Sequence, residues 1–591
     1  MNILPTVKSF VPASGQVFLK DLSAGKGSAL NAFIREKLEK AIPSFSFAKG
    51  ATGKFSFSLT KKGKGVLKAE DPGKGFDAYV MQVSEKEIRI DSGSASGLFY
   101  GFITLLKLAR NGAAVPCGTY RDEAAIALRM IHWDLKGYQP KLPVMMEELE
   151  ILASYKVNAI LLEVEDKYDY KCAPEVGCST AYSFKEMREI SKKAALLNIM
   201  IVPKLQSIAH VDYLLKHKRY KKLRETDHAF QYCCSSPEVD KLWNAMADEL
   251  MACFAEHDKY FHIGADEAIN LGECPKCQKL GPAGSYIRRA GKSIEHILAT
   301  GRTPIMWDDI LRKGESGMTP KQVKECWQLG RKSVLMFWAY GYGGSGNTFP
   351  ELKSYLDAGM RVWGASGFSG CDNWAGSLPP LAIRSLNSDA WAKTAREMKM
   401  ECVCCTGWGR IASADCPTEP HESSWYTILY AANSMWTGAP MDLVKFIYLL
   451  SMEMYGEVPE QPLVNAILNI GKNPYEITNV LDREFSSDRF AFLNLAAAAE
   501  SLTKVREKFC DWNSYYFGKL GREMEDYRIA YMKRWPNVLS ERVAKFKGKM
   551  DKVLRKFYGD YTADAFMTSR FGYLEKLIDD TARLTEKTKK M

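Results

Sequence analysis

From about residue 125 the chain alternates between short, almost continuously apolar segments and stretches with apolar residues at helical spacing. The apolar segments predict eight strands, at residues 127–133, 159–164, 199–205, 259–264, 303–307, 334–338, 361–365 and 402–406. The amphipathic stretches predict helices at 144–155, 184–197, 237–256, 285–300, 350–358, 389–398 and 423–435. Parallel strands covered on both faces read as apolar runs, so eight strand–helix repeats predict a (β/α)8 TIM barrel. An open doubly wound sheet is the alternative, and it is disfavoured because no glycine-rich dinucleotide fingerprint follows the first strand.

Two further regions flank the predicted barrel. Before it, the pattern predicts a helix at 29–42, strands at 54–60, 79–83 and 87–91, and a helix at 97–110. After about residue 440 no strand pattern returns, and long helices are predicted at 489–508, 518–534, 539–558 and 563–590. We therefore expect an α/β protein with a small N-terminal α/β domain at 1–124, a barrel at 125–440 and a C-terminal helical region at 441–591.

Composition and charge narrow the class of protein. With 46% hydrophobic and 26% charged residues, the 591-residue chain is a folded globular protein. The net charge of +11 is modest, and its dense basic stretches, 216–224 and 587–590, indicate a solvated helix face and a chain end rather than a nucleic-acid site. No apolar run reaches the ~18 residues of a membrane span, and residues 1–15 lack the apolar core of a signal peptide. We expect a soluble, cytoplasmic protein with no membrane or nucleic-acid partner.

In a (β/α)8 barrel the reactive groups lie at the carboxyl ends of the strands. The residues found there are mostly carboxylates and tryptophans: Asp134, Glu163, Glu165, Asp166, Gln206, His210, Asp266, Glu267, Trp307, Asp308, Asp309, Trp338, Tyr340, Asp372, Trp374, Trp408 and Arg410. Carboxylates accept hydrogen bonds from hydroxyls and carry acid–base chemistry, and indole faces pack against the apolar faces of a pyranose. This mixture predicts a carbohydrate site.

The fourth predicted strand ends in two adjacent carboxylates. Strand alternation places His262, Gly264 and Asp266 on one face, toward the barrel axis, and Gly264 is expected to let a ligand approach the strand. Neighbouring carboxylates cannot share one face of a pleat, so Asp266 and Glu267 must reach different points of a substrate. Different environments allow them different pKa values and different roles.

These residues also carry a resemblance to a known family. The run His262-Ile263-Gly264-Ala265-Asp266-Glu267 resembles the His-x-Gly-x-Asp-Glu signature of glycoside hydrolase family 20, the β-N-acetylhexosaminidases, with surroundings most like the hexosaminidase D branch. Further matches occur along the chain in the same order as in the family. They are 97–101 with 104–106 in the N-terminal domain, 129–137 on the first strand, 162–166 on the second, 206–210 and 214–217 after the third, and 307–309 on the fifth. The resemblance covers about residues 55–440, and the order of the motifs carries it.

The resemblance implies a mechanism and a set of site residues. The substrate's 2-acetamido oxygen attacks the anomeric carbon to form an oxazolinium intermediate, Asp266 orients the acetamide, and Glu267 is the general acid and base. Trp307, Trp338 and Trp408 are expected to wall the acetamide pocket. The remaining predicted substrate contacts are Arg129, His210, Tyr340, Asp372 and Arg410. No cofactor and no metal are expected.

One position departs from the family pattern. Many members end the eighth strand with Trp-x-Glu, whose Glu holds the outer hydroxyls of the sugar, whereas this chain has Trp408-Gly409-Arg410. Glu419 or Glu422 from the following loop are the candidates to replace that carboxylate. Arg129 matches a barrel arginine by position alone, and a bond to a structural carboxylate is its alternative role.

The 15 cysteines are scattered, odd in number and often inside apolar runs, which favours reduced thiols over a disulfide framework. Cys274 and Cys277 have Cys-x-x-Cys spacing that could supply half of a zinc site, with Cys233 and Cys234 as possible partners. Because adjacent cysteines are awkward ligands on one ion, we expect free thiols.

The predicted function is a retaining exo-β-N-acetylhexosaminidase that hydrolyses terminal β-linked N-acetylglucosamine or N-acetylgalactosamine. Two alternatives stay open: an endo-acting hydrolase of the same substrate-assisted type, and an amino-sugar-binding protein without turnover. The pair Asp266–Glu267 argues against the second, since binding alone does not need a proton donor beside the glycosidic oxygen.

Overall fold

The computed structural model of the protein describes residues 3–24, 34, 36–37, 55–60, 67–341, 348–371, 376–410, 412–413, 415–469, 475–519 and 526–589. Eight parallel strands close into a barrel in the order β10-β11-β12-β13-β14-β7-β8-β9. They are β7 (Leu128–Asp134), β8 (Ala159–Glu163), β9 (Met200–Lys204), β10 (Tyr260–His262), β11 (Thr303–Trp307), β12 (Val334–Trp338), β13 (Arg361–Ser369) and β14 (Cys402–Gly407). The predicted barrel and all eight of its strands are therefore confirmed.

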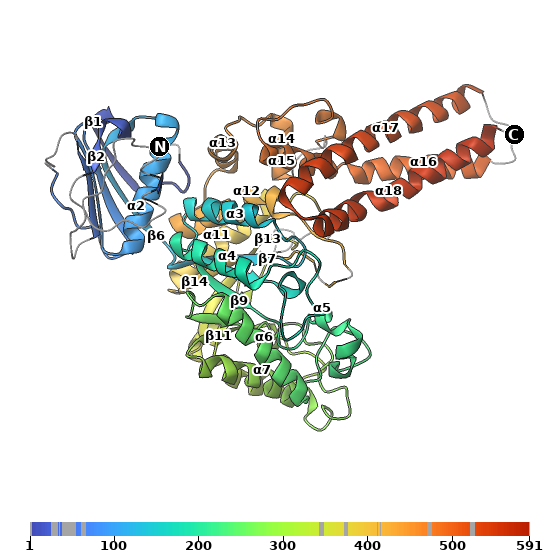
Figure 1. The fold of residues 1–591 in the computed structure, drawn as a ribbon, viewed down its shortest axis with the longest axis horizontal. Helices are drawn as coiled ribbons and strands as arrows, with labels where there is room; N and C mark the ends of the chain where they lie inside the picture. Colours follow the sequence, from blue (N-terminus) through green and yellow to red (C-terminus); the bar gives the residue numbers. More distant parts are fainter. Residues whose placement is uncertain are drawn as a thin grey trace.

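Helices cover the outside of the barrel (Figure 1). They are α3 (Leu142–Ser154), α4 (Phe184–Leu196), α6 (Pro237–Cys253), α7 (Gly281–Ala299), α9 (Pro320–Gly330), α10 (Leu352–Asp357), α11 (Leu381–Glu397) and α12 (Trp425–Thr437), with the short α5 (Asp212–Leu215) and α8 (Asp309–Arg312) in loops. Helix α9 was not predicted, although Thr319 and Gln322 form a capping box at its start, a signal that can be read from the sequence.

The strand that precedes the carboxylate pair is shorter than predicted. We expected 259–264, but β10 stops at His262, because Gly264 and Ala265 take successive positive φ values of 65° and 70° that turn the chain out of the extended conformation. The alternation holds where the strand exists: the His262 ring lies 4.7 Å from that of Trp307 inside the barrel, and Phe261 packs on Trp243 of α6 outside it.

An antiparallel six-stranded sheet forms the N-terminal unit, in the order β1-β6-β4-β5-β3-β2. Its strands are β1 (Ser9–Val17), β2 (Ser23–Ala24), β3 (Phe55–Thr60), β4 (Phe76–Val83), β5 (Glu87–Ser92) and β6 (Val115–Ala124), and α2 (Ala95–Leu108) packs on them. Most of the predicted helix at 29–42 lies outside the described residues. A buried ion pair joins this unit to the barrel, with Lys156 Nζ 2.8 Å from Asp122 Oδ2.

The C-terminal region is helical, as predicted, and extends from the barrel as an arm of α16, α17 and α18 (Figure 1). Its helices are α13 (Leu443–Met454), α14 (Gln461–Leu468), α15 (Asp488–Ala499), α16 (Leu502–Lys519), α17 (Asp526–Phe557) and α18 (Asp560–Lys589). We expected separate helices at 518–534 and 539–558, but α17 covers 526–557 as one helix with Pro536 inside it, and residues 518–519 belong to α16. Proline removes one backbone donor from the helix, which the rest of this long helix tolerates. Among the described residues, no helix has the length and apolar character needed to cross a bilayer.

The turn between α17 and α18 packs on the barrel near the carboxyl ends of its strands. The N–H of Lys141, at the start of α3, donates to Phe557 O at 2.8 Å. Arg570 of α18 is buried and donates from Nη2 to the carbonyls of Pro417 and Thr418, both at 3.0 Å. The Thr418 N–H donates in turn to Gly409 O. The C-terminal region thus holds the loop that follows β14.

Replacing Arg570 with Met is expected to lower the free energy of unfolding by about 1–3 kcal/mol, because the change leaves buried carbonyls without a donor. Urea unfolding followed by tryptophan fluorescence measures this effect. Arg583→Met is the matched control, since Arg583 lies on the same helix with its side chain 73% exposed. Equal midpoints for the two variants would show that the Arg570 contacts do not hold the loop.

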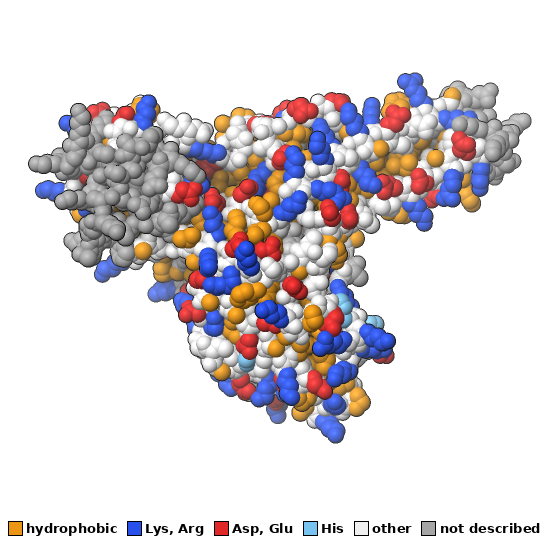
Figure 2. Space-filling model, viewed as in Figure 1, with side chains coloured by type: hydrophobic (Ala, Val, Ile, Leu, Met, Phe, Trp, Pro, Cys, Tyr) orange, Lys and Arg blue, Asp and Glu red, His pale blue; other side chains and the backbone are white. Residues whose placement is uncertain are grey.

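The surface charge is mixed. On the face shown in Figure 2, Lys and Arg side chains lie among Asp and Glu side chains. The basic stretch at 216–224 forms the 3-10 helix Lys218–Leu223, which buries Tyr220 and Leu223 and exposes its lysines, in keeping with a solvated helix face.

Candidate active site

A pocket opens at the carboxyl ends of the barrel strands, where the sequence placed the chemistry. It is lined by Lys136, His210, Asp266, Glu267, Trp307, Trp338, Tyr340, Gly370, Trp408 and Arg410. Both predicted catalytic carboxylates and six of the predicted substrate-binding side chains therefore meet in one cavity. Lys136 and Gly370 were not predicted, although Lys136 lies in the first-strand motif at 129–137, which could have pointed to it.

The loop after β10 turns two adjacent carboxylates into different surroundings. Positive φ values at Gly264, Ala265 and Glu267 bend the chain sharply, a strained conformation that folded proteins keep mainly at functional sites. The Asp266 side chain is 8% exposed and that of Glu267 is 51% exposed. Asp266 Oδ1 is buried without a hydrogen-bond partner in the described part of the chain. The two carboxylates thus differ in solvation, as two different roles require.

Gly264 has a different purpose from the one expected. A Cβ atom built at this position would lie 1.7 Å from Gln206 Oε1, so the close approach is by the Gln206 side chain and not by a ligand. The interpretation of Gly264 as room for a ligand is wrong. Glycine is favoured here by its positive φ, and a larger residue would also force the Gln206 side chain to move.

His210 connects the two carboxylates. Its Nε2 lies 3.1 Å from Glu267 Oε2 and 3.6 Å from Asp266 Oδ2. Burial alone would lower the pKa of His210, but the hydrogen bond with Glu267 and the charge of Asp266 raise it above its ordinary value. The same hydrogen bond lowers the pKa of Glu267. The pair therefore shares one proton, which resides mainly on the imidazole in the free protein.

Asp309 supports this loop from behind. Its Oδ2 accepts the backbone N–H of Glu267 at 2.9 Å. Burial, and then the charge of Asp266, raise the pKa of Asp309 to about 8. At neutral pH Asp309 is therefore mainly protonated and uncharged, behind the loop that carries Asp266 and Glu267.

Aromatic side chains form the wall of the pocket. The ring centroids of Trp307 and Trp408 lie 5.7 Å apart, and Trp338 stacks on Tyr340 at 5.3 Å. Trp408 Nε1 donates to the Tyr340 hydroxyl at 3.0 Å, which fixes the indole. Trp307 Nε1 is buried and has no partner among the described residues, so it is a donor left for a bound group.

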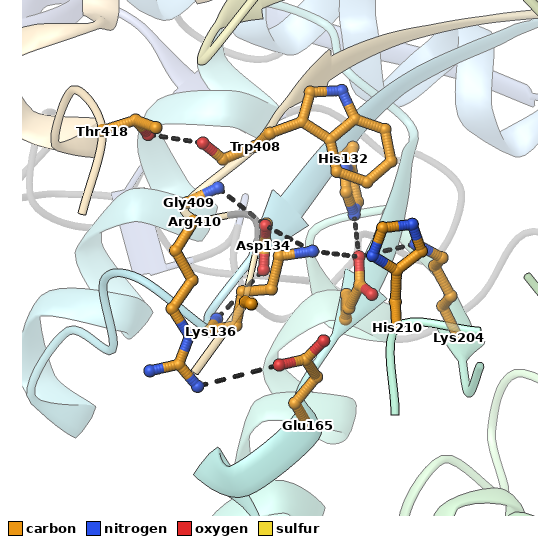
Figure 3. A network of polar contacts seen from close by, with 12 residues as sticks. His132, Asp134, Lys136, Glu165, Lys204, His210, Trp408, Gly409, Arg410 and Thr418 are labelled. Carbon is orange, nitrogen blue, oxygen red and sulfur yellow. Dashed lines mark hydrogen bonds and ion pairs between the residues drawn. The ribbon is translucent and has the colours of Figure 1, made fainter. Parts of the chain in front are cut away.

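A buried charged network adjoins the pocket through Lys136 (Figure 3). Glu163 Oε2 lies 2.7 Å from Lys204 Nζ, 3.0 Å from His132 Nε2 and 3.6 Å from Lys136 Nζ. Although burial would raise it, the charges of Lys136 and Lys204 hold the pKa of Glu163 well below its ordinary value. Asp134 Oδ2 lies 3.3 Å from Lys136 Nζ and accepts the Gly409 N–H at 2.7 Å. The network ties the first three strands to the loop that carries Trp408 and Arg410.

Arg410 enters the pocket as a paired cation. Its Nη2 lies 3.0 Å from Asp166 Oδ1. The same atom lies 3.7 Å from Glu165 Oε2, a contact drawn in Figure 3. The pKa of Glu165 is raised to about 8, by burial and by the charge of Glu163, against the opposing effect of Lys136. The position that carries a carboxylate in many family members thus holds a guanidinium, with two carboxyl groups from the loop after β8 beside it.

The two carboxylates proposed to replace the usual glutamate do not line the pocket. Glu419 Oε2 accepts the Gly370 N–H at 2.8 Å, behind the pocket wall. Glu422 accepts from Trp425 Nε1 at 3.0 Å and pairs with Arg489. Both are buried structural groups, so the expectation that either one reaches the sugar is wrong.

The prediction that Arg129 contacts the substrate is also wrong. It lies at the amino end of β7, fully buried, and donates from Nε to Lys156 O at 2.7 Å and from Nη1 to Ile126 O at 2.8 Å. Its Nη2 pairs with Asp77 of the N-terminal sheet at 2.8 Å. Arg129 therefore stabilises the junction between the sheet and the barrel, at the end opposite the pocket. Asp372, the remaining predicted contact, lies outside the described residues, as does Trp374.

Comparison with known proteins gives matches to two models of one family. The model for "glycosyl hydrolase family 20, catalytic domain" matches residues 140–362, and the model for domain 2 of the same family matches residues 1–123. Hexosaminidase D of Bos taurus is 27% identical over 300 residues, which cover 48% of this chain and 84% of that protein.

Two solved structures share the fold. The chitobiase of Flavobacterium johnsoniae aligns over 93% of this chain and 88% of its own, with a TM-score of 0.58 and 17% identity. The exo-β-N-acetylglucosaminidase of Vibrio harveyi, in complex with N-acetylglucosamine, aligns over 76% of both chains, with a TM-score of 0.56 and 16% identity.

Proposed function

The chain belongs to glycoside hydrolase family 20, and we propose that it is a retaining, exo-acting β-N-acetylhexosaminidase with substrate-assisted catalysis. The observation that carries the proposal is the divergence of Asp266 and Glu267 within one tryptophan-walled pocket. We propose further that residues 125–440 carry the activity and that 1–124 and 441–591 are not catalytic. The substrate class is a terminal β-linked N-acetylhexosamine.

Asp266 is proposed to act on the acetamide. Its buried Oδ1 has no partner among the described residues, and a carboxylate oxygen in such a place is a ready acceptor for the acetamide N–H. This bond turns the acetamide oxygen toward the anomeric carbon and stabilises the positive charge that develops as the oxygen attacks. Trp307, Trp338 and Trp408 confine the acetamide methyl group and exclude water. The protein then needs no nucleophile of its own.

Glu267 is proposed to protonate the departing oxygen and later to deprotonate the attacking water. Its side chain lines the pocket and is half-exposed, which leaves it accessible to a leaving group and to water. The cavity has a volume of about 220 Å³. That room suits one sugar residue, which supports exo action.

Two measurements test the proposal. An aryl β-N-acetylglucosaminide is expected to be hydrolysed, and the matching aryl β-glucoside, with a 2-hydroxyl in place of the acetamide, to be turned over very poorly. Proton NMR of the first-formed sugar is expected to show the β anomer. An α anomer at early times, or equal turnover of both glycosides, would overturn the mechanism.

The alternative functions have their own outcomes. Binding of the glycoside without turnover would favour a sugar-binding protein. Release of internal fragments from a chitin oligomer would favour an endo-acting hydrolase.

The shared proton predicts a pH effect for His210→Gln. In the wild type, the His210–Glu267 pair keeps one proton until pH rises through the raised pKa of His210, above its ordinary value of about 6.5. Without the imidazole and its hydrogen bond, Glu267 alone holds the proton, and its pKa returns toward the ordinary value of 4.5, which is still below the pKa of His210. The alkaline limb of kcat/KM is therefore expected to move to lower pH, with a large loss at pH 7 and a small one near pH 4.

The control for this prediction is His296→Gln, a histidine on α7 that pairs with Asp248 and lies outside the pocket. Its pH profile is expected to match that of the wild type. A His210→Gln profile lowered by the same factor at every pH would show that His210 only supports the loop and does not hold the proton.

A further inference from the structure

Three cysteines and a glutamate meet beside the active-site loops, outside the pocket. They are Glu225, Cys233, Cys274 and Cys277, and one donor atom of each lies within 4.8 Å of the others. Cys233 Sγ is 3.5 Å from Cys274 Sγ and 3.8 Å from Cys277 Sγ. The four side chains come from two loops, one between β9 and α6 and one between β10 and α7.

The spacing of the thiols fits a tetrahedral metal. Thiolates bound at about 2.3 Å to a tetrahedral zinc ion lie about 3.8 Å from one another, close to both measured separations. A disulfide would need about 2.05 Å and would leave one of the three sulfurs unpaired. Cys277 also donates its backbone N–H to Cys274 Sγ at 3.4 Å, and Ser235 Oγ lies 3.1 Å from Cys277 Sγ. Such contacts orient thiolate ligands and spread their charge.

Glu225 provides the independent observation. The residue is buried, and its Oε1 accepts the Cys274 N–H at 2.9 Å. Its Oε2 is buried and makes no hydrogen bond within the described residues. A buried carboxylate oxygen without a partner is costly, and a cation beside it removes that cost. Oε2 is thus the natural fourth ligand, while Oε1 is held in place by the loop backbone.

We propose that Glu225, Cys233, Cys274 and Cys277 bind a structural zinc ion. Zinc is favoured because thiolates select soft or borderline cations and a closed four-ligand tetrahedral set is typical of structural zinc. The expectation of free thiols rested on the adjacency of Cys233 and Cys234. The structure removes that objection, because only Cys233 joins the cluster, while Cys234 Sγ lies 3.8 Å from Tyr232 O.

The ion would clamp the two loops that carry the catalytic groups. The first loop carries His210 and the second carries Asp266 and Glu267. Direct contact between the loops in this region includes the Asn270 N–H, which donates to Gln231 Oε1 at 3.1 Å. Zinc would add four strong bonds across the same interface and so fix the distance between His210 and Glu267. The binding claim itself does not depend on the proposed activity.

Metal analysis of the full-length protein, expressed with added zinc and then gel-filtered, tests the proposal. About one zinc per chain is expected for the wild type. Cys277→Ser and Glu225→Gln are expected to lose most of it, and Cys234→Ala, at a buried cysteine beside the cluster, is expected to keep it. Wild-type protein without stoichiometric zinc would overturn the proposal, and so would loss of zinc from Cys234→Ala.

A second measurement covers variants that fail to fold. Wild-type protein stripped with a chelator is expected to melt at a lower temperature and to recover when zinc is restored. Reconstitution with Co²⁺ is expected to give thiolate-to-cobalt charge-transfer absorption and the intense visible bands of a tetrahedral ion. An unchanged melting temperature together with a cobalt spectrum free of these bands would refute the site. A disulfide that joins Cys233 to Cys274 or Cys277 in non-reduced peptide mass spectra would refute it as well.

Discussion

Glu267→Gln is expected to reduce kcat/KM on a natural disaccharide by about 10²–10⁴-fold, the usual contribution of a general acid. On a nitrophenyl glycoside the loss should be much smaller, because the departing phenolate is stable without a proton. Glutamine keeps the size of the side chain and cannot donate a carboxyl proton. The ratio of the two losses, measured on the same enzyme preparation, therefore reports proton donation and not general damage to the pocket.

Azide, a small anion that can replace water as the nucleophile of the second step, provides a further test of Glu267. If Glu267 also activates water in the second step, azide, which needs no deprotonation, should partly restore turnover of the nitrophenyl glycoside by Glu267→Gln and form a β-glycosyl azide. Equal losses on both substrates, with no rescue by azide, would remove Glu267 from the acid–base role.

Asp266→Asn is expected to reduce kcat/KM by about 10²–10³-fold, the scale of losing one preorganised electrostatic contact to the transition state. The loss should be similar for the disaccharide and the nitrophenyl glycoside, because the acetamide oxygen displaces the leaving group in one step and this assistance is needed whichever group departs. The asparagine side chain would still accept a hydrogen bond but would carry no charge to stabilise the oxazolinium nitrogen. A loss that depends on leaving-group acidity, as for Glu267→Gln, would contradict the division of roles, and full activity would exclude Asp266 from catalysis.

The barrel could be predicted because its strands are buried on both faces and therefore appear as uninterrupted apolar runs. β11 and β12 match their predicted bounds, and most other strands agree to within a residue or two. The edge strand β1 was missed because its residues, Ser9–Val17, are mostly exposed and include a proline, so they carry little apolar signal. β10 was predicted too long because apolar residues continue through Ile263 and Ala265. The backbone angles that end the strand there cannot be read from the sequence.

The site was predictable to the extent that it lies at strand ends. Trp307, Trp338 and Trp408 converge because parallel strands bring their carboxyl ends to one edge of the barrel. The prediction for Arg129 was wrong because this residue lies at the other end of its strand. Its partner there, Asp77, belongs to the N-terminal sheet, and the strand–helix pattern of the barrel does not predict that contact. The pairing of Arg410 with Asp166 and the meeting of Glu225 with three cysteines join loops that are far apart in the sequence. Such contacts depend on loop paths, which periodicity does not encode.

The claim that the substrate's own acetamide is the nucleophile is tested most directly by changing that group alone. A series of aryl β-glycosides with acetamido, fluoroacetamido, difluoroacetamido and trifluoroacetamido groups at carbon 2 keeps the leaving group and nearly keeps the shape. Each fluorine withdraws electrons from the carbonyl oxygen and weakens its attack. The wild-type enzyme is expected to show kcat/KM values that fall steadily along the series. Values that stay level from acetamide to trifluoroacetamide would show that the acetamide does not attack and would contradict the mechanism proposed for this pocket.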